Sequence, residues 1–221
     1  ARINARQAGI SAGIEVARAV FARLDERICF LPQVEDGAPV AADEVLIRLQ
    51  GSARALLAGE RTALNFLQQL SGVATLTHRF VAAVAATSAQ ITDTRKTTPG
   101  WRQLQKWAVQ LGGGVNHRMG LYDAVLIKEN HAAAAGGVGH AARQARMTAA
   151  QRGRGEVPIM VEAESLDDVR ELVSLATAER PDRILLDNMS PDLMWPALHL
   201  IRAADPPIEI EATGNIDLST V

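Results

Sequence analysis

The stretch IMVEAESLDDVRELVSLATAERPDRILLD, residues 159–187, decides the fold. Two short apolar runs, 159–162 and 184–187, each end in an acidic residue, Glu162 and Asp187. Between them, residues 166–178 repeat apolar side chains at helical spacing. A strand, a helix and a second strand in this order predict two parallel strands of one sheet.

The same unit recurs on both sides of this stretch. We expect strands at 89–92, 124–128, 159–162, 184–187 and 208–211, and helices at 101–111, 140–151, 166–178 and 192–202. The polar residues that follow or end these strands are separated by 34, 34, 25 and 24 residues; they are Thr94, Lys128, Glu162, Asp187 and Glu211. A closed barrel and an open doubly wound sheet both fit this spacing. Polar residues at the end of every strand favour the barrel, in which all the loops meet at one mouth.

The first 86 residues have a different texture. Short strands are expected near 2–6, 28–34 and 45–49, and a helix at 14–24. Ser52 is a candidate N-cap for a helix that Gly72 is expected to interrupt before a second helical stretch ends near residue 86. The prediction is an α/β protein with an N-terminal α+β sandwich and connecting helices in 1–86 and a parallel α/β barrel in 87–221. We expect a partial chain, truncated at both ends, with the C-terminal barrel units missing.

Composition and charge argue against some classes of protein. The 221 residues are 48% hydrophobic and 22% charged with a net charge of −2, which argues against a nucleic-acid-binding protein. No apolar run approaches the roughly 20 residues of a membrane span, and no signal peptide is visible, so a cytoplasmic location is expected. The single cysteine, Cys29, has no partner for a disulfide or a metal site, and we expect it to be buried.

Two segments carry clustered cations. Thr94-Arg95-Lys96-Thr97-Thr98-Pro99-Gly100 places an arginine fork beside a lysine point charge, a combination that suits carboxylates and phosphates. Gly112-Gly113-Gly114-Val115-Asn116-His117-Arg118 adds a flexible backbone followed by further donors. Each is interpreted as an anion-binding loop.

Charged residues also end the apolar strands. Lys128 follows an apolar run and is expected to be buried, where a lysine is costly unless it is paired or functional. Glu162 and Asp187 suit ribose hydroxyls or a divalent cation, or an ion pair with Lys128. The assembled mouth would be a cationic cup for a small ligand with several negative charges. It contains no serine-histidine-acid order, no cysteine nucleophile and no His/Cys metal spacing.

These motifs together resemble quinolinate phosphoribosyltransferase (nicotinate-nucleotide pyrophosphorylase, carboxylating). The matching stretches are Gly59 to Asn65, Leu70 to Ala74, Asp93 to Gly100, Gly112 to Gly120, Leu126 to His131, Leu185 to Asn188, and Gly214-Asn215. The resemblance implies transfer of a phosphoribosyl group from phosphoribosyl pyrophosphate (PRPP) to quinolinate. Pyrophosphate and carbon dioxide are then lost, and nicotinate mononucleotide enters NAD biosynthesis. It also implies Mg²⁺ and a homodimer or higher oligomer.

The resemblance further implies roles for particular residues. Lys128, Glu162 and Asp187 would be catalytic, and Glu162 and Asp187 would hold Mg²⁺ directly or through water. Arg95, His117 and Arg118 would bind the quinolinate carboxylates, and Lys96 the phosphates of PRPP. Arg61 would be donated to the neighbouring subunit's site. The substrate-binding set is Arg61, Thr94, Arg95, Lys96, His117, Arg118, Lys128, Glu162, Asp187, Thr213, Gly214 and Asn215.

The sequence departs from the family pattern in places. Met160 stands where an acid is common, Thr213 replaces a serine but keeps the hydroxyl, and Trp101 and Trp107 are expected to serve packing. Two other interpretations remain. One is a sister pyrophosphorylase of the molybdenum-associated branch acting on another acceptor, against which Asn116-His117-Arg118 and Lys128-Glu129-Asn130-His131 argue. The other is a non-catalytic barrel that binds anionic metabolites.

Overall fold

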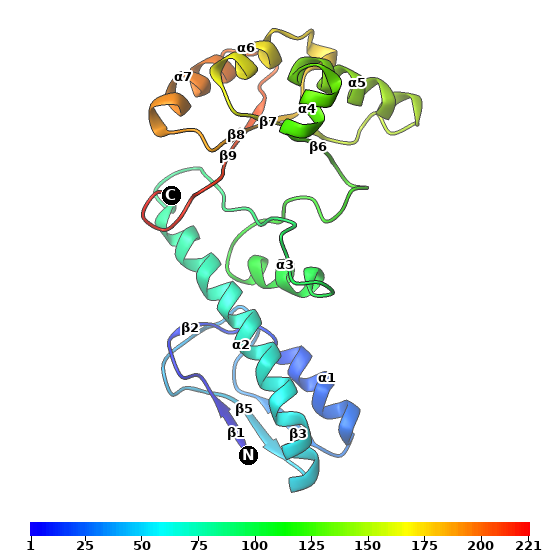
Figure 1. Ribbon diagram of the computed structural model, residues 1–221. Coiled ribbons are helices and arrows are strands. Elements are labelled where there is room, and N and C mark those ends of the chain that lie inside the picture. The colour runs from blue at the N-terminus through cyan, green and yellow to red at the C-terminus, as the bar shows by residue number, and fades with distance from the viewer. The chain divides into compact units, whose positions relative to one another are not determined.

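The computed structural model describes residues 1–221, which divide into two compact units. The first comprises residues 1–119 with 221, and the second residues 120–220. Figure 1 shows the elements of each unit. The predicted domain boundary after residue 86 stays a prediction.

The first unit is an α+β arrangement. Its elements are β1 (Arg2–Asn4), β2 (Gly9–Ile10), α1 (Ile14–Leu24), β3 (Cys29–Pro32), β4 (Pro39–Val40), β5 (Val45–Gln50), α2 (Ala53–Ala83) and α3 (Arg102–Leu111). An antiparallel sheet has the order β1-β5-β3, and β2 pairs with β4. The apolar sides of α1 and α2 form a core with this sheet through Phe21, Ile47 and Leu67. The helix predicted at 14–24 is confirmed.

The long helix α2 begins as the sequence indicates. The Ser52 hydroxyl accepts the Ala55 N–H at 3.2 Å, which makes Ser52 the N-cap. The expected interruption at Gly72 is wrong, because α2 continues through it to Ala83. A mid-helix glycine costs only about 1 kcal/mol, and packing of Leu67, Leu70 and Ala74 on either side of Gly72 outweighs that cost.

The expectation that Cys29 is buried is also wrong. Cys29 is exposed, since β3 is an edge strand of the three-stranded sheet. On this strand it is Phe30 that packs against the core.

The second unit is built on parallel strands. Its elements are β6 (Val125–Ile127), α4 (Glu129–Ala135), α5 (Val138–Gln151), β7 (Ile159–Ala163), α6 (Leu166–Ser174), the 3₁₀ turn η1 (Thr177–Glu179), β8 (Arg183–Asp187), α7 (Pro191–Arg202) and β9 (Glu209–Thr213). The strands pair in the order β6-β7-β8-β9, all parallel. The prediction of an α/β fold with an incomplete parallel barrel is confirmed: four strands form an open sheet with edges at β6 and β9.

Two details of the second half differ from expectation. Residues 89–92 form no strand, and only Thr92 makes a parallel bridge, to Val115 of the first unit. The short helix α4 follows β6 directly and was not expected. Its seven residues, ENHAAAA, include four alanines, the residue with the best helix propensity.

Side-chain alternation separates the two faces of the parallel sheet. Helices α4–α7 cover one face of the sheet (Figure 1). Val161, Ile184 and Leu186 belong to the core that these helices form with the sheet. The opposite face carries Leu126, Met160 and Leu185, three of the four members of a small apolar cluster. Strand register places Glu162 opposite Leu185, and Asp187 two residues further along, so both acids lie on this second face.

An ion-pair network lies at the other end of the same face. The Arg183 guanidinium bonds Glu209 at 2.6 Å and Glu211 at 2.8 Å. Partial burial disfavours the charged form, but the two carboxylates outweigh burial and raise the pKa of Arg183.

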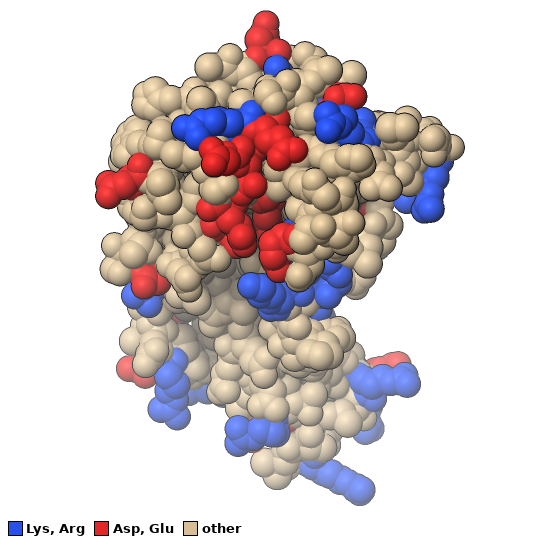
Figure 2. Space-filling model, turned by 45° about the horizontal axis from the view of Figure 1, so that its top comes forward, with Lys and Arg blue, Asp and Glu red and all other residues tan.

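Charge is mixed on the surface. Figure 2 shows acidic side chains gathered in the middle of one face, with basic side chains beside them. No helix combines the length and apolar character that crossing a membrane requires.

Two glycines of α2 allow a test of the packing between α1 and α2. A Cβ at Gly59 would stand 2.8 Å from the ring of Phe21, which is buried, whereas a Cβ at Gly72 would have no atom within 4 Å. We expect Gly59→Ala to lower the free energy of unfolding by about 1–3 kcal/mol through overpacking. Gly72→Ala should raise it by up to about 1 kcal/mol through helix propensity. Urea denaturation of the two variants checks this, and equal shifts would contradict the close approach at Gly59.

Candidate active site

Two loops of the first unit carry the clustered cations, and a short parallel bridge joins them. The Val115 N–H donates to the Ile91 carbonyl at 2.9 Å, and the Asp93 N–H to the Val115 carbonyl at 3.3 Å. The backbone is therefore hydrogen-bonded just before the predicted anion-binding segment 94–100 and within the segment 112–118.

Helix α3 braces both loops from one side. Arg102 donates from Nε to the Thr97 hydroxyl at 3.2 Å and from Nη1 to the Met119 carbonyl at 3.3 Å. Gln105 exchanges two hydrogen bonds with Thr98, at 2.9 and 3.1 Å. At the start of the helix, Trp101 stacks on Phe66 with ring centroids 4.6 Å apart, which is a packing role.

A buried ion pair lies beneath the two loops. Lys106 of α3 is 1% exposed, and its Nζ bonds the Asp93 carboxylate and the His117 carbonyl, the latter at 2.8 Å. Asp93 also accepts the His117 N–H at 2.9 Å. With its amide oriented to satisfy both groups, Asn116 donates to Asp93 Oδ2 at 2.8 Å and to the Lys106 carbonyl at 2.9 Å.

The backbone also selects the proton position on His117. The Arg118 N–H donates to His117 Nδ1 at 2.8 Å, so this nitrogen is the acceptor. In the neutral ring the proton then lies on Nε2, which is the donor nitrogen of the ring.

Arg95 is the half-buried member of the first loop. Its Nε is buried and has no hydrogen-bond partner within the chain, a state that costs free energy unless an acceptor is supplied. Thr94 and Lys96 are exposed, and the Lys96 N–H donates to the Thr94 hydroxyl at 3.1 Å.

The three glycines serve the fold of this unit. A Cβ at Gly112 would stand 2.4 Å from the Ala74 carbonyl, and one at Gly114 2.8 Å from Thr77, so α2 leaves no room for a side chain. Gly113 adopts a φ of +90°, which glycine tolerates best. The run therefore brings the 115–118 segment close to α2.

In the second unit the structure brings Lys128 and Glu162 together. Lys128 Nζ lies 2.8 Å from Glu162 Oε1, and Glu162 is 9% exposed. The expectation of a buried lysine is wrong, because the Lys128 side chain is 45% exposed and only its partner is buried. The backbone at Lys128 is fixed, since its N–H donates to His131 Nδ1 at 3.1 Å.

The loops after β8 and β9 interlock around Asp187. Its carboxylate accepts the Asn188 amide at 2.9 Å, and Asn188 Oδ1 accepts the Asn215 amide at 2.9 Å. Asn188 and Asn215 both adopt positive φ, and a Cβ at Gly214 would clash with Asn188 Oδ1. Thr213, Gly214 and Asn215 are thus held beside Asp187, at the carboxyl end of the sheet.

No group of three or more His, Cys, Asp or Glu residues is arranged to hold a metal ion. Met160 occupies a buried apolar cluster with Ala124 and Leu185, so its position here is one of packing.

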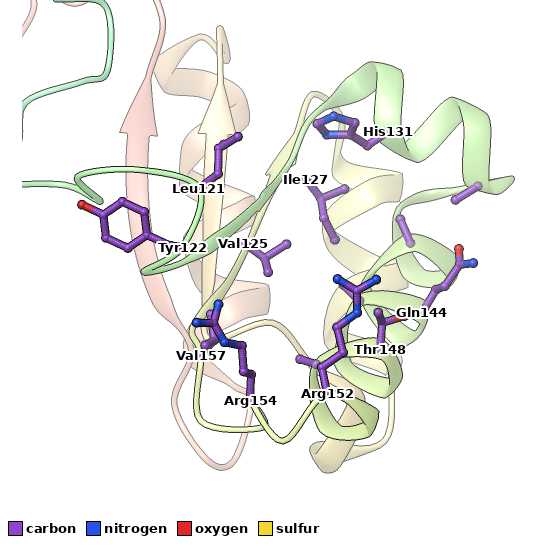
Figure 3. A pocket seen from close by; sticks show the side chains of 14 residues that line it. Leu121, Tyr122, Val125, Ile127, His131, Gln144, Thr148, Arg152, Arg154 and Val157 are labelled. Carbon is purple, nitrogen blue, oxygen red and sulfur yellow. The ribbon is translucent and has the colours of Figure 1, made fainter. Parts of the chain in front are cut away.

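A hollow of about 420 Å³ lies elsewhere in the second unit (Figure 3). It is lined by Val125 and Ile127 of β6 and by the side of α5 that carries Ala141 and Ala145, with Arg152 and Arg154 at one end. These β6 residues point to the helix-covered face, away from Glu162 and Asp187. The hollow is therefore separate from the candidate site.

Each unit gathers its own set of the predicted residues. Thr94, Arg95, Lys96, His117 and Arg118 lie on two bonded loops of the first unit, and Lys128, Glu162, Asp187 and Thr213–Asn215 lie at the carboxyl ends of the parallel strands of the second. Arg61 is exposed on α2. The sequence reasoning missed Asp93, Lys106 and Asn188. Lys106 gave little signal, because a lysine in a helix is ordinarily solvated. Asp93 and Asn188 stood out only as end residues of stretches that resemble the family.

Comparison with known protein families agrees with this geometry. Residues 1–71 match the family described as quinolinate phosphoribosyl transferase, N-terminal domain, and residues 73–221 match its C-terminal domain. A Synechocystis protein named probable nicotinate-nucleotide pyrophosphorylase (carboxylating) is 42% identical over 221 residues, which cover all of this chain and 72% of that protein. A Mycobacterium leprae protein named nicotinate-nucleotide pyrophosphorylase (carboxylating) is 42% identical, covering 96% of this chain and 72% of that protein.

Solved structures agree as well. The nicotinate-nucleotide pyrophosphorylase from Francisella tularensis is 37% identical and superposes with a TM-score of 0.87, covering 97% of this chain and 72% of that one. Both halves of the chain and its fold thus match one group of proteins, and the chain belongs to the quinolinate phosphoribosyltransferase family.

Proposed function

We propose that this protein transfers the phosphoribosyl group of PRPP to quinolinate and releases carbon dioxide, giving nicotinate mononucleotide for NAD biosynthesis. The ring nitrogen of quinolinate forms a bond to C1 of the ribose as the bond from C1 to the pyrophosphate oxygen breaks. The bond from ring C2 to its carboxylate then breaks, and C2 takes up a proton. The protein is accordingly a pentosyltransferase.

One observation carries this proposal: the similarity spans residues 1–71 and 73–221, and these ranges contain every charged motif. A Nicotiana tabacum relative that is 39% identical over 232 residues, covering 64% of that protein, is named quinolinate phosphoribosyltransferase (decarboxylating) 2b, mitochondrial. The reaction needs no nucleophile from the protein. It needs fixed charges around a leaving pyrophosphate and a carbocation-like ribose, and such charges are what the chain carries.

Arg95, His117 and Arg118 are proposed to bind the two quinolinate carboxylates. Arg95 has a buried Nε–H without an acceptor, and His117 has its Nε2 as a donor. A guanidinium fork and a ring N–H match the oxygen atoms of a carboxylate. Because hydrogen bonds from α3 already fix both loops, little ordering entropy is lost on binding.

The donor substrate is proposed to lie against the other charged groups. Thr94 and Lys96 would bind its phosphates, and Thr213, Gly214 and Asn215 would begin the cradle for the 5-phosphate. Glu162 and Asp187 would accept hydrogen bonds from the ribose hydroxyls. Lys128 would place its ammonium near the reacting carbon and the leaving group, oriented by its ion pair with Glu162.

The acids also fit Mg²⁺, which we propose as the cofactor. Glu162 and Asp187 lie on one face of adjacent strands, and no third acidic or histidine ligand is grouped with them. Mg²⁺ commonly binds through one or two carboxylates, directly or through water, and takes its remaining ligands from water and substrate phosphates. When bound, the ion would neutralise charge on the pyrophosphate.

A homodimer in which Arg61 completes the neighbouring site is part of the proposal, as is a cytoplasmic location. Arg61 is exposed on α2, and Leu57, one turn earlier on the same side of the helix, is 71% exposed. An exposed leucine beside an arginine suits a surface that a second subunit covers.

Substrate selectivity tests the function. We expect nicotinate mononucleotide from quinolinate and PRPP, with kcat/KM for nicotinate lower by at least about 10³-fold, because loss of the 2-carboxylate leaves a half-buried cationic residue unpaired. The measurement is product mass and pyrophosphate release with each acid in the presence of Mg²⁺. Comparable turnover of nicotinate would refute the quinolinate assignment.

Lys128 tests the chemistry. Lys128→Ala should lower kcat/KM by about 10²–10³-fold, because a fixed charge at the reacting end is lost. The fold should survive with a melting midpoint lowered by several degrees, because the lysine is half exposed but its removal leaves the buried Glu162 carboxylate without its partner. Arg170→Ala, which removes an exposed ion pair to Asp167 in the same unit, is the control and should stay active. Near-native turnover of Lys128→Ala would assign the lysine to packing.

Donation of Arg61 can be tested by complementation. Inactive Arg61→Ala and inactive Lys128→Ala are mixed, unfolded and refolded together. Random pairing makes about half the dimers mixed, each with one intact site, so about a quarter of all sites should be active. If the mixture stays inactive while the two variants are shown to co-assemble, Arg61 acts within its own chain.

A further inference from the structure

Lys106 and Asp93 form an ion pair in which both charged side chains are buried. Lys106 lies on α3 and is 1% exposed, and the Asp93 side chain is 6% exposed. Burying two charges costs several kcal/mol in desolvation, and apolar replacements of such pairs are often as stable. Stability alone therefore does not account for a lysine here.

The hydrogen bonds of the pair point to a different role. Lys106 Nζ binds the His117 carbonyl, and Asp93 Oδ1 binds the His117 N–H, so the two charges grip both polar groups of one residue's backbone. Asp93 Oδ2 adds the Asn116 side chain. If the parallel ladder between these loops continued regularly, the backbone carbonyl of Asp93 would accept the His117 N–H. The Asp93 carboxylate accepts it instead.

The same pair is continuous with the first cationic loop. Asp93 immediately precedes Thr94 and Arg95, while His117 immediately precedes Arg118, and the Arg118 N–H fixes the His117 ring. The position of Arg95 and the orientation of the His117 ring thus both depend on the Asp93 carboxylate.

We infer that Lys106 and Asp93 are positioning residues that set the spacing of Arg95, His117 and Arg118, the groups proposed to bind the quinolinate carboxylates. The inference rests on the proposed function. The pair contacts no substrate; it acts through the backbone at 93–95 and 116–118. Displacement of a binding group by about 1 Å is enough to lower rates by about 10²-fold, so loss of the pair would impair use of the acceptor substrate.

The test is Lys106→Met, which keeps the length of the side chain and removes its charge and donors. We expect the KM for quinolinate to rise about 10–100-fold while the KM for PRPP stays within about threefold. Hydrogen exchange of the peptide 112–119, followed by mass spectrometry, should become faster. The matched control is Leu104→Ala on the same helix, which removes partly buried packing and should lower the melting midpoint without either effect.

A second variant separates positioning from stability and serves if Lys106→Met does not fold. Lys106→Met combined with Asp93→Asn removes both buried charges, so the melting midpoint should recover at least partly while the KM for quinolinate stays raised. Recovery of that KM in the double variant would overturn the inference. So would an equal rise of both KM values in Lys106→Met, or the same split in Leu104→Ala.

Failure of the proposed function would look different. The wild-type protein would then make no nicotinate mononucleotide, and the exchange measurement would decide the inference by itself. Faster exchange at 112–119 in Lys106→Met but not in Leu104→Ala would support the positioning role. Unchanged exchange would overturn it.

Discussion

Alternation of side chains along four parallel strands is the constraint on which the second unit depends. One set of alternate residues, including Val161 and Ile184, must meet the covering helices, and the other set must then face the opposite way. The strand ends Lys128, Glu162 and Asp187 belong to that second set. Burial of the core thus places the charged groups on one face without any interaction among them being required.

In the first unit, the charged side chains are held in place by hydrogen bonds to a helix rather than by alternation along strands. Its loops carry no regular strand beyond the bridge at Thr92 and Val115, so hydrogen bonds from α3 take the place of a sheet. The glycines at 112 and 114 let the second loop come close to α2, and the Asp93 carboxylate substitutes for a missing backbone acceptor. A short helix therefore defines the positions of side chains that neither loop fixes alone.

The charges suit a reaction whose difficulty is electrostatic. A dicarboxylate and a polyphosphate must approach one another, and a pyrophosphate must leave, so repulsion and developing charge are the main barriers. Under the proposed function, cations on rigid backbones would address both barriers, and two acids with an ion-paired lysine would hold the ribose and Mg²⁺. Because the reaction needs fixed charges and no nucleophile, the residues that carry the family resemblance lie on loops and at strand ends.

The sequence by itself determined the alternation of strands and helices, the helix at 14–24, the N-cap at Ser52 and the family, because these depend on local periodicity and on short motifs. Tertiary structure decided the rest. Gly72 stays helical because packing on both sides outweighs its propensity, and Cys29 is exposed because β3 became an edge. Lys106 is buried while Lys128 is half exposed, the reverse of what their neighbours in sequence suggest. Whether a lysine is buried depends on which distant groups can pair with it, and Asp93 and the His117 carbonyl reach Lys106 only once the chain has folded.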